Sequence, residues 1–90
     1  MEFAWVTRKA ALNLKKHKVA FMDAVQVFGD DHRIEKFDGR EPYSEDRFVT
    51  IGLFDGNALV VVYAARDHII RIISARKAQP NERRTYWENR

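Results

Sequence analysis

The sequence predicts an α+β fold in which helices pack on one face of an antiparallel sheet. In the first third of the chain, apolar residues recur at intervals of three and four, as along one side of a helix. From about residue 33 the pattern changes to short apolar segments separated by turn signals, which is typical of strands. Near the end of the chain, Pro80 is suited to begin a last helix. We therefore expect two N-terminal helices, a four-stranded antiparallel sheet and a C-terminal helix.

Each expected helix is bounded by residues suited to helix ends. Thr7 can cap a first helix over residues 8–17. A second helix, Phe21–Phe28, presents an apolar stripe and would end at Gly29, a typical C-terminal glycine. The third is expected over Pro80–Trp87, because proline is accommodated in the first turn of a helix.

The four strands are expected at Arg33–Phe37, Arg47–Leu53, Ala58–Ala65 and Ile69–Ala75. Turn chemistry occupies Asp38–Pro42, and Asp55-Gly56 is a strong hairpin signal. Arg66-Asp67-His68 is a short turn into the last strand. Strands joined by such short turns pair antiparallel, and the nearly all-apolar third strand is expected at the centre of the sheet.

The last strand carries arginines among apolar residues. Regular alternation predicts that Ile70, Ile72, Ser74 and Arg76 share one face, opposite Ile69, Arg71, Ile73 and Ala75. An arginine on an apolar strand needs an anionic partner, either an internal acid such as Glu45 or Asp46, or a bound ligand. Taken together, four cations favour an anion site: Arg66, Arg71, Arg76 and Lys77.

Size and composition restrict the class of protein. Ninety residues are enough for one hydrophobic core. The absence of cysteine excludes disulfides, thiol chemistry and cysteine-based zinc sites. The N-terminus does not resemble a signal peptide, and the longest apolar run, Ala58–Ala65, is too short to span a membrane. We expect a cytoplasmic protein.

The net charge of +3 is unevenly distributed. Residues 1–29 carry five basic and two acidic side chains, and residues 66–90 carry seven basic and three acidic ones. Residues 30–55 carry four basic and eight acidic side chains. A segregated basic surface attracts polyanions such as RNA, although a solvated surface without a ligand is the alternative.

Histidine is the other candidate for chemistry. RNA can be cleaved without metal when its own 2′-OH attacks the adjacent phosphate, while the protein moves two protons and stabilises charge. His68 precedes the arginine-bearing strand and His17 ends a basic helix, so both are candidates, with Glu45 as a possible base. Each could instead be a surface or capping residue. No spacing resembles a metal site, a glycine-rich phosphate loop or a nucleophile elbow.

Three segments resemble a known family in the correct order. The first comprises Phe3-Ala4-Trp5, Lys9, Asn13, Lys16-His17, Val19 and Phe21. The second comprises Tyr43-Ser44-Glu45-Asp46-Arg47-Phe48 and Ile51-Gly52. The third comprises Arg71-Ile72-Ile73-Ser74-Ala75-Arg76, Glu82-Arg83 and Tyr86. Together they are similar to the BrnT toxins over residues 1–90, as one BrnT-like domain.

The resemblance implies a RelE-like fold and a ribonuclease toxin of a type II toxin–antitoxin pair. It also implies a BrnA-type antitoxin with a ribbon-helix-helix part that neutralises the toxin and represses their operon. Two toxins would sit on an antitoxin dimer, and operator DNA would be bound only through the antitoxin. The basic sheet positions of the family correspond to Arg71 and Arg76, and its opening motif includes Lys16 and His17.

Three positions depart from the family pattern, all at helix ends. Val6 replaces the usual aspartate before the first helix, so Thr7 is expected to cap instead. Lys18 replaces a glycine and requires either another helix end or a left-handed lysine. Gln79 replaces a serine or threonine, which weakens an expected capping box with Glu82.

The leading hypothesis is therefore a metal-independent endoribonuclease toxin that needs no cofactor. Arg71 and Arg76 would hold the scissile phosphate, and His68 or His17 would move protons. The cations expected to guide the RNA backbone are Lys16, Arg66 and Lys77. The alternative is a non-catalytic module that binds its antitoxin and acts with it in transcriptional autoregulation.

Overall fold

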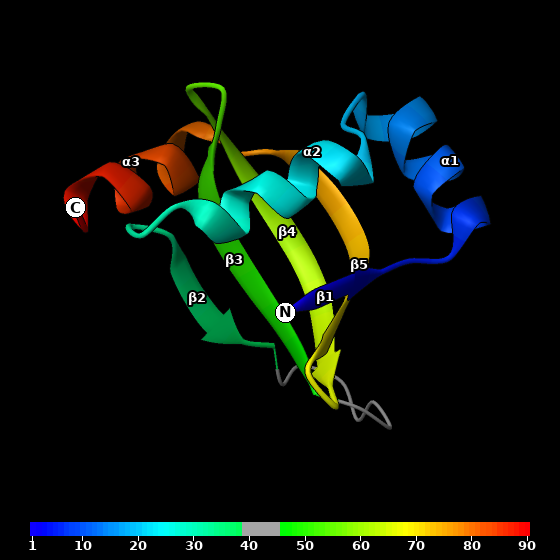
Figure 1. The fold of residues 1–90 in the computed structure, drawn as a ribbon. Helices are drawn as coiled ribbons and strands as arrows, with labels where there is room; N and C mark the ends of the chain where they lie inside the picture. Colours follow the sequence, from blue (N-terminus) through cyan, green and yellow to red (C-terminus); the bar gives the residue numbers. More distant parts are fainter. Residues whose placement is uncertain (39–45) are drawn as a thin grey trace.

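A computed structural model describes residues 1–38 and 46–90, and in it a five-stranded sheet has helices on both faces (Figure 1). The strands are β1 (Glu2–Ala4), β2 (Ile34–Phe37), β3 (Arg47–Phe54), β4 (Asn57–Arg66) and β5 (Ile69–Lys77). Their order in the sheet is β1-β5-β4-β3-β2. The turn expected at Asp38–Pro42 and the candidate base Glu45 lie largely or wholly outside the described residues.

The four predicted strands are confirmed as antiparallel neighbours, with β4 at the centre of the sheet. The predicted strand count was wrong, because β1 adds a fifth strand that pairs parallel with β5 and makes the sheet mixed. Its register places Glu2 beside Ile69 and Ala4 beside Arg71. A three-residue strand has no periodicity of its own, and its pairing depends on the open edge of β5.

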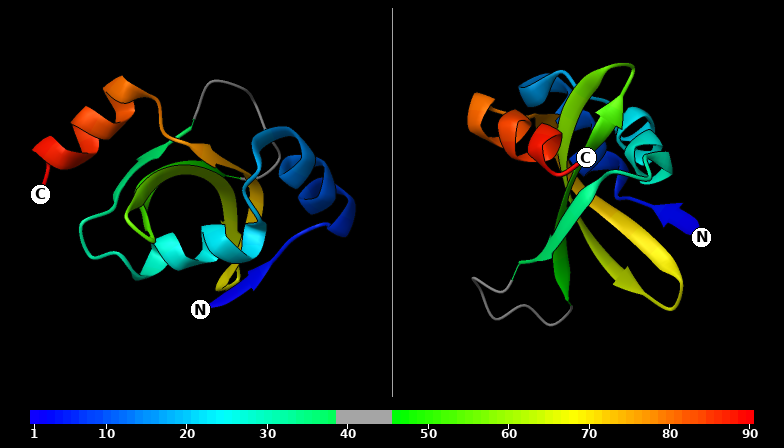
Figure 2. Two further views of the ribbon diagram at one scale, coloured as in Figure 1. Left: turned by 90° about the horizontal axis from the view of Figure 1, so that it is seen from above. Right: turned by 90° about the vertical axis from the view of Figure 1, so that its left-hand side faces the viewer.

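The helices are α1 (Thr7–His17), α2 (Phe21–Val25) and α3 (Pro80–Glu88), with a 3₁₀ helix, η1 (Gln26–Gly29), after α2. Figure 2 shows α1 and α2 on one side of the sheet and α3 on the other. The prediction that the helices share one face was therefore wrong for α3. The chain crosses over after β5, where Ala78 packs against Ala58 and Val60. In the parts that the structure describes, no helix is long and apolar enough to span a membrane.

The ends of the N-terminal helices differ from the prediction in detail. Thr7 is the first helical residue rather than the cap, and Val6 occupies the N-cap without a side-chain hydrogen bond. Of the two predicted alternatives for Lys18, another helix end or a left-handed lysine, the structure has the left-handed one (φ 61°), and the Lys18 N–H donates to the carbonyl oxygen of Leu14. The second helix tightens into η1 rather than continuing to Phe28, and Gly29 does not have a positive φ.

The main core lies between the sheet and the layer of α1, α2 and η1. Its fully buried members include Ala24, Val27 and Val61. Gly52 of β3 permits the close approach of η1, because a Cβ there would lie 3.0 Å from the Cβ of Val27 and 3.1 Å from its carbonyl oxygen. A second, smaller core lies under α3 on the opposite face. Both faces of the sheet thus exclude water over part of their area.

A β-bulge in β5 decides which side chains reach each face. Val62 pairs with Ser74, but the next residue, Tyr63, pairs with Ile72, so Ile73 is an extra residue in β5. The expected regular alternation was therefore wrong. Ile70, Ile72 and Ala75 are buried on the helical side, whereas Arg71, Ser74 and Arg76 lie on the opposite face. The bulge brings the two arginines onto one face.

Asn13 of α1 satisfies the edge of β5 beyond the end of β1. Its Nδ2 donates to the carbonyl oxygens of Ala75 (2.8 Å) and Val19 (3.0 Å), and its Oδ1 accepts the N–H of Ala75 (3.1 Å). Asn13 is buried, so these hydrogen bonds are made away from water. One side chain thereby pairs with the strand edge as a neighbouring strand would.

Candidate functional site

The sheet face opposite α1 and α2 carries cations from three strands. We define the cationic face by Lys36, Arg47, Arg71, Ser74 and Arg76. The strand register sets these residues in rows. Arg47 and Arg71 flank Ala64, while Lys36 and Ser74 lie at the ends of a row through Val49 and Val62. Antiparallel pairing therefore assembles a cationic surface from residues far apart in the sequence.

A groove of about 440 Å³ lies on this face. It is lined by Lys36, Phe37, Asp38, Val49, Val60, Val62, Ser74, Arg76 and Glu82. The three valines give it an apolar floor, Lys36 and Arg76 supply positive charge, and Asp38 and Glu82 supply negative charge. A volume of this order is within the usual range for small-ligand sites. The groove can thus receive a ligand with an apolar surface, and Lys36 and Arg76 are the groups in its lining that can contact an anion.

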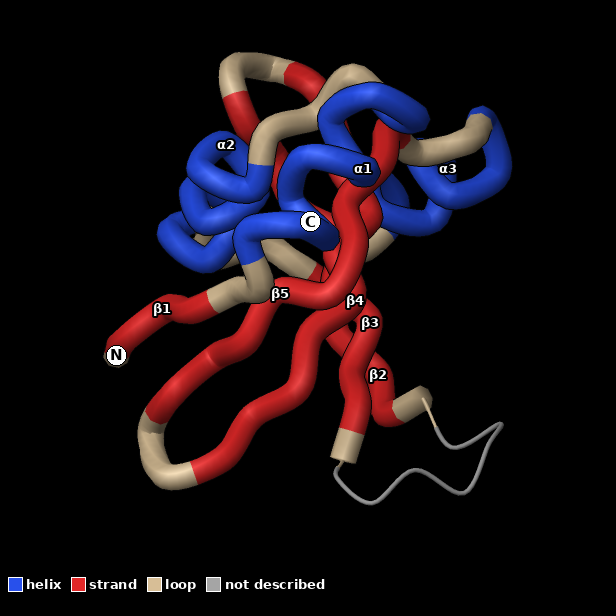
Figure 3. The backbone as a smooth tube through the Cα atoms, turned by 90° about the vertical axis from the view of Figure 1, so that its right-hand side faces the viewer, coloured by secondary structure: helices blue, strands red, loops and turns tan. Residues whose placement is uncertain are grey.

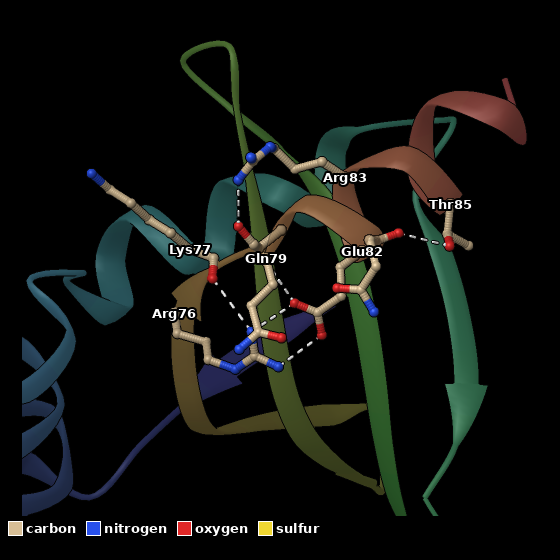
Figure 4. Close-up of polar contacts among 8 residues, drawn as sticks. Arg76, Lys77, Gln79, Glu82, Arg83 and Thr85 are labelled. Atoms are coloured by element: carbon tan, nitrogen blue, oxygen red, sulfur yellow. Dashed lines mark hydrogen bonds and ion pairs between the residues drawn. The ribbon is translucent and has the colours of Figure 1, made fainter.

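Arg76 is held in the groove by a bidentate ion pair with Glu82 of α3. Its Nη1 and Nη2 each donate to one carboxylate oxygen of Glu82 at 2.8 Å, and Figure 4 shows the two side chains facing each other. The hydrogen bonds with Glu82 raise the pKa of Arg76, and those with Arg76 lower the pKa of Glu82. The side chain of Arg76 is still 37% exposed. The predicted internal salt bridge thus exists for Arg76, and Glu82 is its partner.

The side chain of Glu82 also caps the start of α3. Its Oε1 accepts the backbone N–H of Gln79 at 2.8 Å, and the Gln79 side chain accepts a backbone hydrogen bond from Glu82. The capping box therefore forms despite the glutamine that was expected to weaken it. Because one carboxylate binds both the helix start and Arg76, the position of α3 and that of the Arg76 guanidinium are linked.

The structure brings only some of the predicted site residues together. Arg71 and Arg76 share the cationic face, and the register places Arg66 on the same face at its far end. His68 is exposed in the β4–β5 turn, which projects away from the helices (Figure 3). Asp67 and His68 both have left-handed backbone there, with φ of 53° and 67°. His68 is thus near Arg71 in sequence but lies beyond the strand end.

The remaining predicted cations lie elsewhere. Lys16 and His17 end α1, in the layer on the other side of the sheet. Lys77 is exposed and points away from the Arg76–Glu82 pair (Figure 4), and its register partner Leu59 belongs to the helical-side core. In residues 1–38 and 46–90, no three His, Asp or Glu side chains gather as metal ligands. The two predicted histidines lie in different parts of the fold, His17 at the end of α1 and His68 in the β4–β5 turn.

Sequence reasoning missed three charged residues of this region: Lys36, Arg47 and Glu82. Local patterns place Lys36 and Arg47 in strands but do not give the register that brings them beside β5. Glu82 was noticed as part of a capping box and not as the partner of Arg76. The one usable signal was the excess of arginine in the last strand, which pointed to an acid nearby.

A second polar cluster, on the helical side, joins β2 to β4. Arg33 contacts Glu35 (2.6 Å) and Thr50 (3.1 Å), and the hydroxyl of Tyr63 donates a short hydrogen bond to Glu35. Burial and the neighbouring Glu35 raise the pKa of Tyr63 to about 12. Burial by itself would raise the pKa of Glu35, but the hydrogen bonds from Tyr63 and Arg33 outweigh burial, and the pKa of Glu35 is lowered. These polar groups are hydrogen-bonded to one another, and we interpret the cluster as a structural link between β2 and β4.

Comparison with known proteins assigns a family. The family model described as "Ribonuclease toxin, BrnT, of type II toxin-antitoxin system" matches residues 5–82, which is most of the chain. The match includes α1, α2, the whole cationic face and Glu82. No curated protein was found that matches the sequence.

Proposed function

The chain belongs to the BrnT family of ribonuclease toxins from type II toxin–antitoxin systems, and from this premise we propose that it is an endoribonuclease that cuts RNA on the cationic face. One observation carries the location. The bulge at Ile73 aligns Arg71, Ser74 and Arg76 on a single face, beside a groove with an apolar floor. RNA can bind to this surface, because its phosphates are anionic and its ribose and bases have apolar faces.

The arginines are proposed to bind successive parts of the RNA backbone. Arg71 and Arg76 are five residues apart on an extended strand, which separates their Cα atoms by roughly 15 Å. They would therefore bind different phosphates rather than one. Arg66 extends the same line toward the β4–β5 turn, whereas Lys77 lies on the helical side and is not proposed to contact this strand of RNA. Lys16 and His17, which lie in the other layer, are poorly placed for this strand of RNA.

Arg76 is the residue proposed to stabilise the transition state. Its two contacts with Glu82 and one with the carbonyl oxygen of Lys77 leave further N–H groups, since a guanidinium has five donors. A guanidinium fixed in advance can stabilise the charge that develops on the phosphate without reorganising during the reaction. Glu82 acts here as a positioning residue.

The proposed reaction uses the RNA's own 2′-OH as nucleophile and does not need a metal ion. The 2′-oxygen bonds to phosphorus, the bond to the 5′-oxygen breaks, and a 2′,3′-cyclic phosphate and a 5′-OH form. One group accepts the 2′-OH proton and another protonates the leaving 5′-oxygen. His68 precedes the first residue of β5 and Arg76 lies near its last, which separates them by roughly 25 Å along the strand, so His68 is not proposed for either transfer at the phosphate that Arg76 binds. Glu45 remains a prediction.

Purified chain incubated with RNA and EDTA tests this proposal. The expected result is endonucleolytic cleavage that leaves cyclic phosphate ends and falls at least about 100-fold in Arg76→Ala, as for loss of one charge-stabilising donor. Cleavage that needs added metal would contradict the mechanism. Cleavage that survives in a folded Arg71→Ala, Arg76→Ala double variant would contradict the location.

A second candidate is a non-catalytic module that only binds the antitoxin. It is favoured by the fact that Glu82 already neutralises Arg76 internally, so a ligand is not required at that position. The Arg76→Glu variant separates the two functions. Lost toxicity with antitoxin binding retained supports the enzyme, and unchanged RNA in cells that express soluble wild-type protein supports the module.

Membership of a type II family implies a protein antitoxin. We propose that it is of the BrnA type, with a ribbon-helix-helix domain whose dimer holds two toxins and binds operator DNA. Light scattering of the co-purified complex tests this, with a 2:2 mass expected. A 1:1 mass would contradict the proposed assembly.

A further inference from the structure

An apolar groove lies between α1 and α2, on the opposite side of the sheet from the cationic face. Its volume is about 270 Å³, and apart from Thr7 its lining is apolar. Trp5, Ala10 and Phe21 form its inner part, and Leu14 and Met22 stand at its edges. Leu14 is 49% exposed and Met22 is 63% exposed. We call this feature the α1–α2 groove.

The rim of the groove is positively charged. α1 contains four Lys or Arg residues and no Asp or Glu. At 100° per residue, Thr7, Ala11 and Leu14 share the stripe that faces the groove, and Arg8 and Lys15 lie along its solvent side. Asp23 is the single acid in α1 and α2, both of which the structure describes completely. A ligand for this groove therefore needs apolar side chains together with negative charge.

We propose that the α1–α2 groove is the docking site for an acidic amphipathic helix of the antitoxin. The identity of the partner rests on the function proposed above, because a type II toxin has a protein antitoxin that binds it. Apolar side chains three or four positions apart on the partner helix enter between Leu14 and Met22. Asp or Glu side chains on the helix flanks contact Arg8 and Lys15.

Two features favour a peptide helix over RNA in this groove. The exposed large side chains of the lining are Leu14 and Met22. Its two aromatic residues, Trp5 and Phe21, are partly and wholly buried, so they do not form a row of exposed rings on which bases could stack. The cations lie beside an apolar slot, which suits a partner with an apolar centre and a charged rim. A slot of this size accepts one or two anchor side chains, so it is the anchor of a larger interface rather than the whole of it.

The location has a functional consequence. Figure 2 shows α1 and α2 on one side of the sheet, so a partner docked in the α1–α2 groove lies on the opposite side of the sheet from the cationic face. Antitoxin binding and RNA cleavage should therefore be separable by substitution. Variants of the groove should remain toxic and escape the antitoxin, while variants of the cationic face should lose toxicity and still bind it.

The experiment expresses full-length toxin and cognate antitoxin from separate inducible promoters and measures growth and co-purification. Leu14→Glu and Met22→Glu should still arrest growth and should need at least about ten times more antitoxin for rescue. Leu12→Glu is the matched control, because Leu12 is 57% exposed on α1 but does not line the groove. It should be rescued like the wild type. Thermal unfolding establishes that each variant is folded.

An Arg8→Glu, Lys15→Glu double variant tests the rim without altering the apolar lining. Its antitoxin binding should weaken and should lose most of its dependence on salt. Groove variants that are rescued and co-purified like Leu12→Glu would overturn the proposal, as would a toxin dimer in solution that Met22→Glu dissolves. Co-purification reports docking even if the wild type proves non-toxic, so failure of the nuclease proposal is distinguishable from failure of this one.

Discussion

Asn13 satisfies the backbone of two segments at once. Its amide is buried and bonds both the N–H and the carbonyl oxygen of Ala75 as well as the carbonyl oxygen of Val19. Asn13→Ala would leave these groups without a partner, and we expect the free energy of unfolding to fall by about 2–4 kcal/mol. Urea denaturation measures this, with exposed Leu12→Ala as the control. A loss as small as that of the control would contradict the role assigned to Asn13.

Asp30 is a second residue that joins several segments, and we expect it to make the stability of the fold depend on pH. It accepts hydrogen bonds from the Tyr86 hydroxyl and from the backbone N–H groups of His32 and Leu53. Burial by itself would raise the pKa of Asp30, but these hydrogen bonds outweigh burial, and the pKa of Asp30 is lowered. A depressed pKa contributes stability above the unfolded value of about 3.9, and this is lost as pH falls through the folded value.

Tyr86→Phe removes one of those donors without emptying the core. Because Tyr86 is fully buried, we expect a loss of roughly 1–2 kcal/mol at neutral pH and a weaker acid dependence below about pH 4. Denaturation at several pH values measures both quantities. An unchanged acid dependence in Tyr86→Phe would show that Asp30 does not depend on this bond.

At the scale of elements, Glu82 links the start of α3 to the end of β5. Glu82→Gln keeps the size of the side chain but replaces a charged bidentate pair with a weaker hydrogen bond. We expect cleavage to fall about tenfold because the Arg76 guanidinium is less well fixed, and stability to fall by no more than about 1 kcal/mol because the pair is partly exposed.

The expected signature of Glu82→Gln is therefore a fall in cleavage that is large compared with the fall in stability. Single-turnover cleavage and urea denaturation of the same protein measure the two effects. Arg76→Lys, which keeps the charge but cannot form a bidentate pair, should behave similarly. Full activity in both variants would show that the pair has no positioning role.

At the scale of the whole molecule, charge on the cationic face should govern the affinity for RNA. Each phosphate contact to single-stranded RNA contributes about 0.7 to the slope of log affinity against log salt. Neutralising Arg66 or Arg71 should lower that slope by about this amount, whereas neutralising Lys9 on α1 should not. Fluorescence titration of a short RNA across salt concentrations measures the slopes. Equal slopes for all three variants would contradict binding on this face.

Local sequence patterns were sufficient to predict β2 to β5 and the three helices, because hairpin turns and apolar periodicity are encoded within a few residues. They were insufficient where structure depends on distant partners. The parallel pairing of β1 requires the free edge of β5, and the bulge at Ile73 is visible only against the register of β4. The candidate site likewise has a part that local patterns predict and a part that depends on distant partners. Arg71 and Arg76 were found within one strand, whereas Lys36 and Glu82 join them only through sheet pairing and the crossing of α3.

The most direct test of the account compares cations on the two sides of the sheet. Wild type, Arg71→Ala, Arg76→Ala and Lys16→Ala are induced in bacteria, and growth and total RNA integrity are followed with soluble protein matched. We predict arrest and RNA loss for the wild type and for Lys16→Ala, and relief in both β5 variants. Arrest that persists in Arg71→Ala and Arg76→Ala but disappears in Lys16→Ala would place the active surface on the helical side and contradict the account.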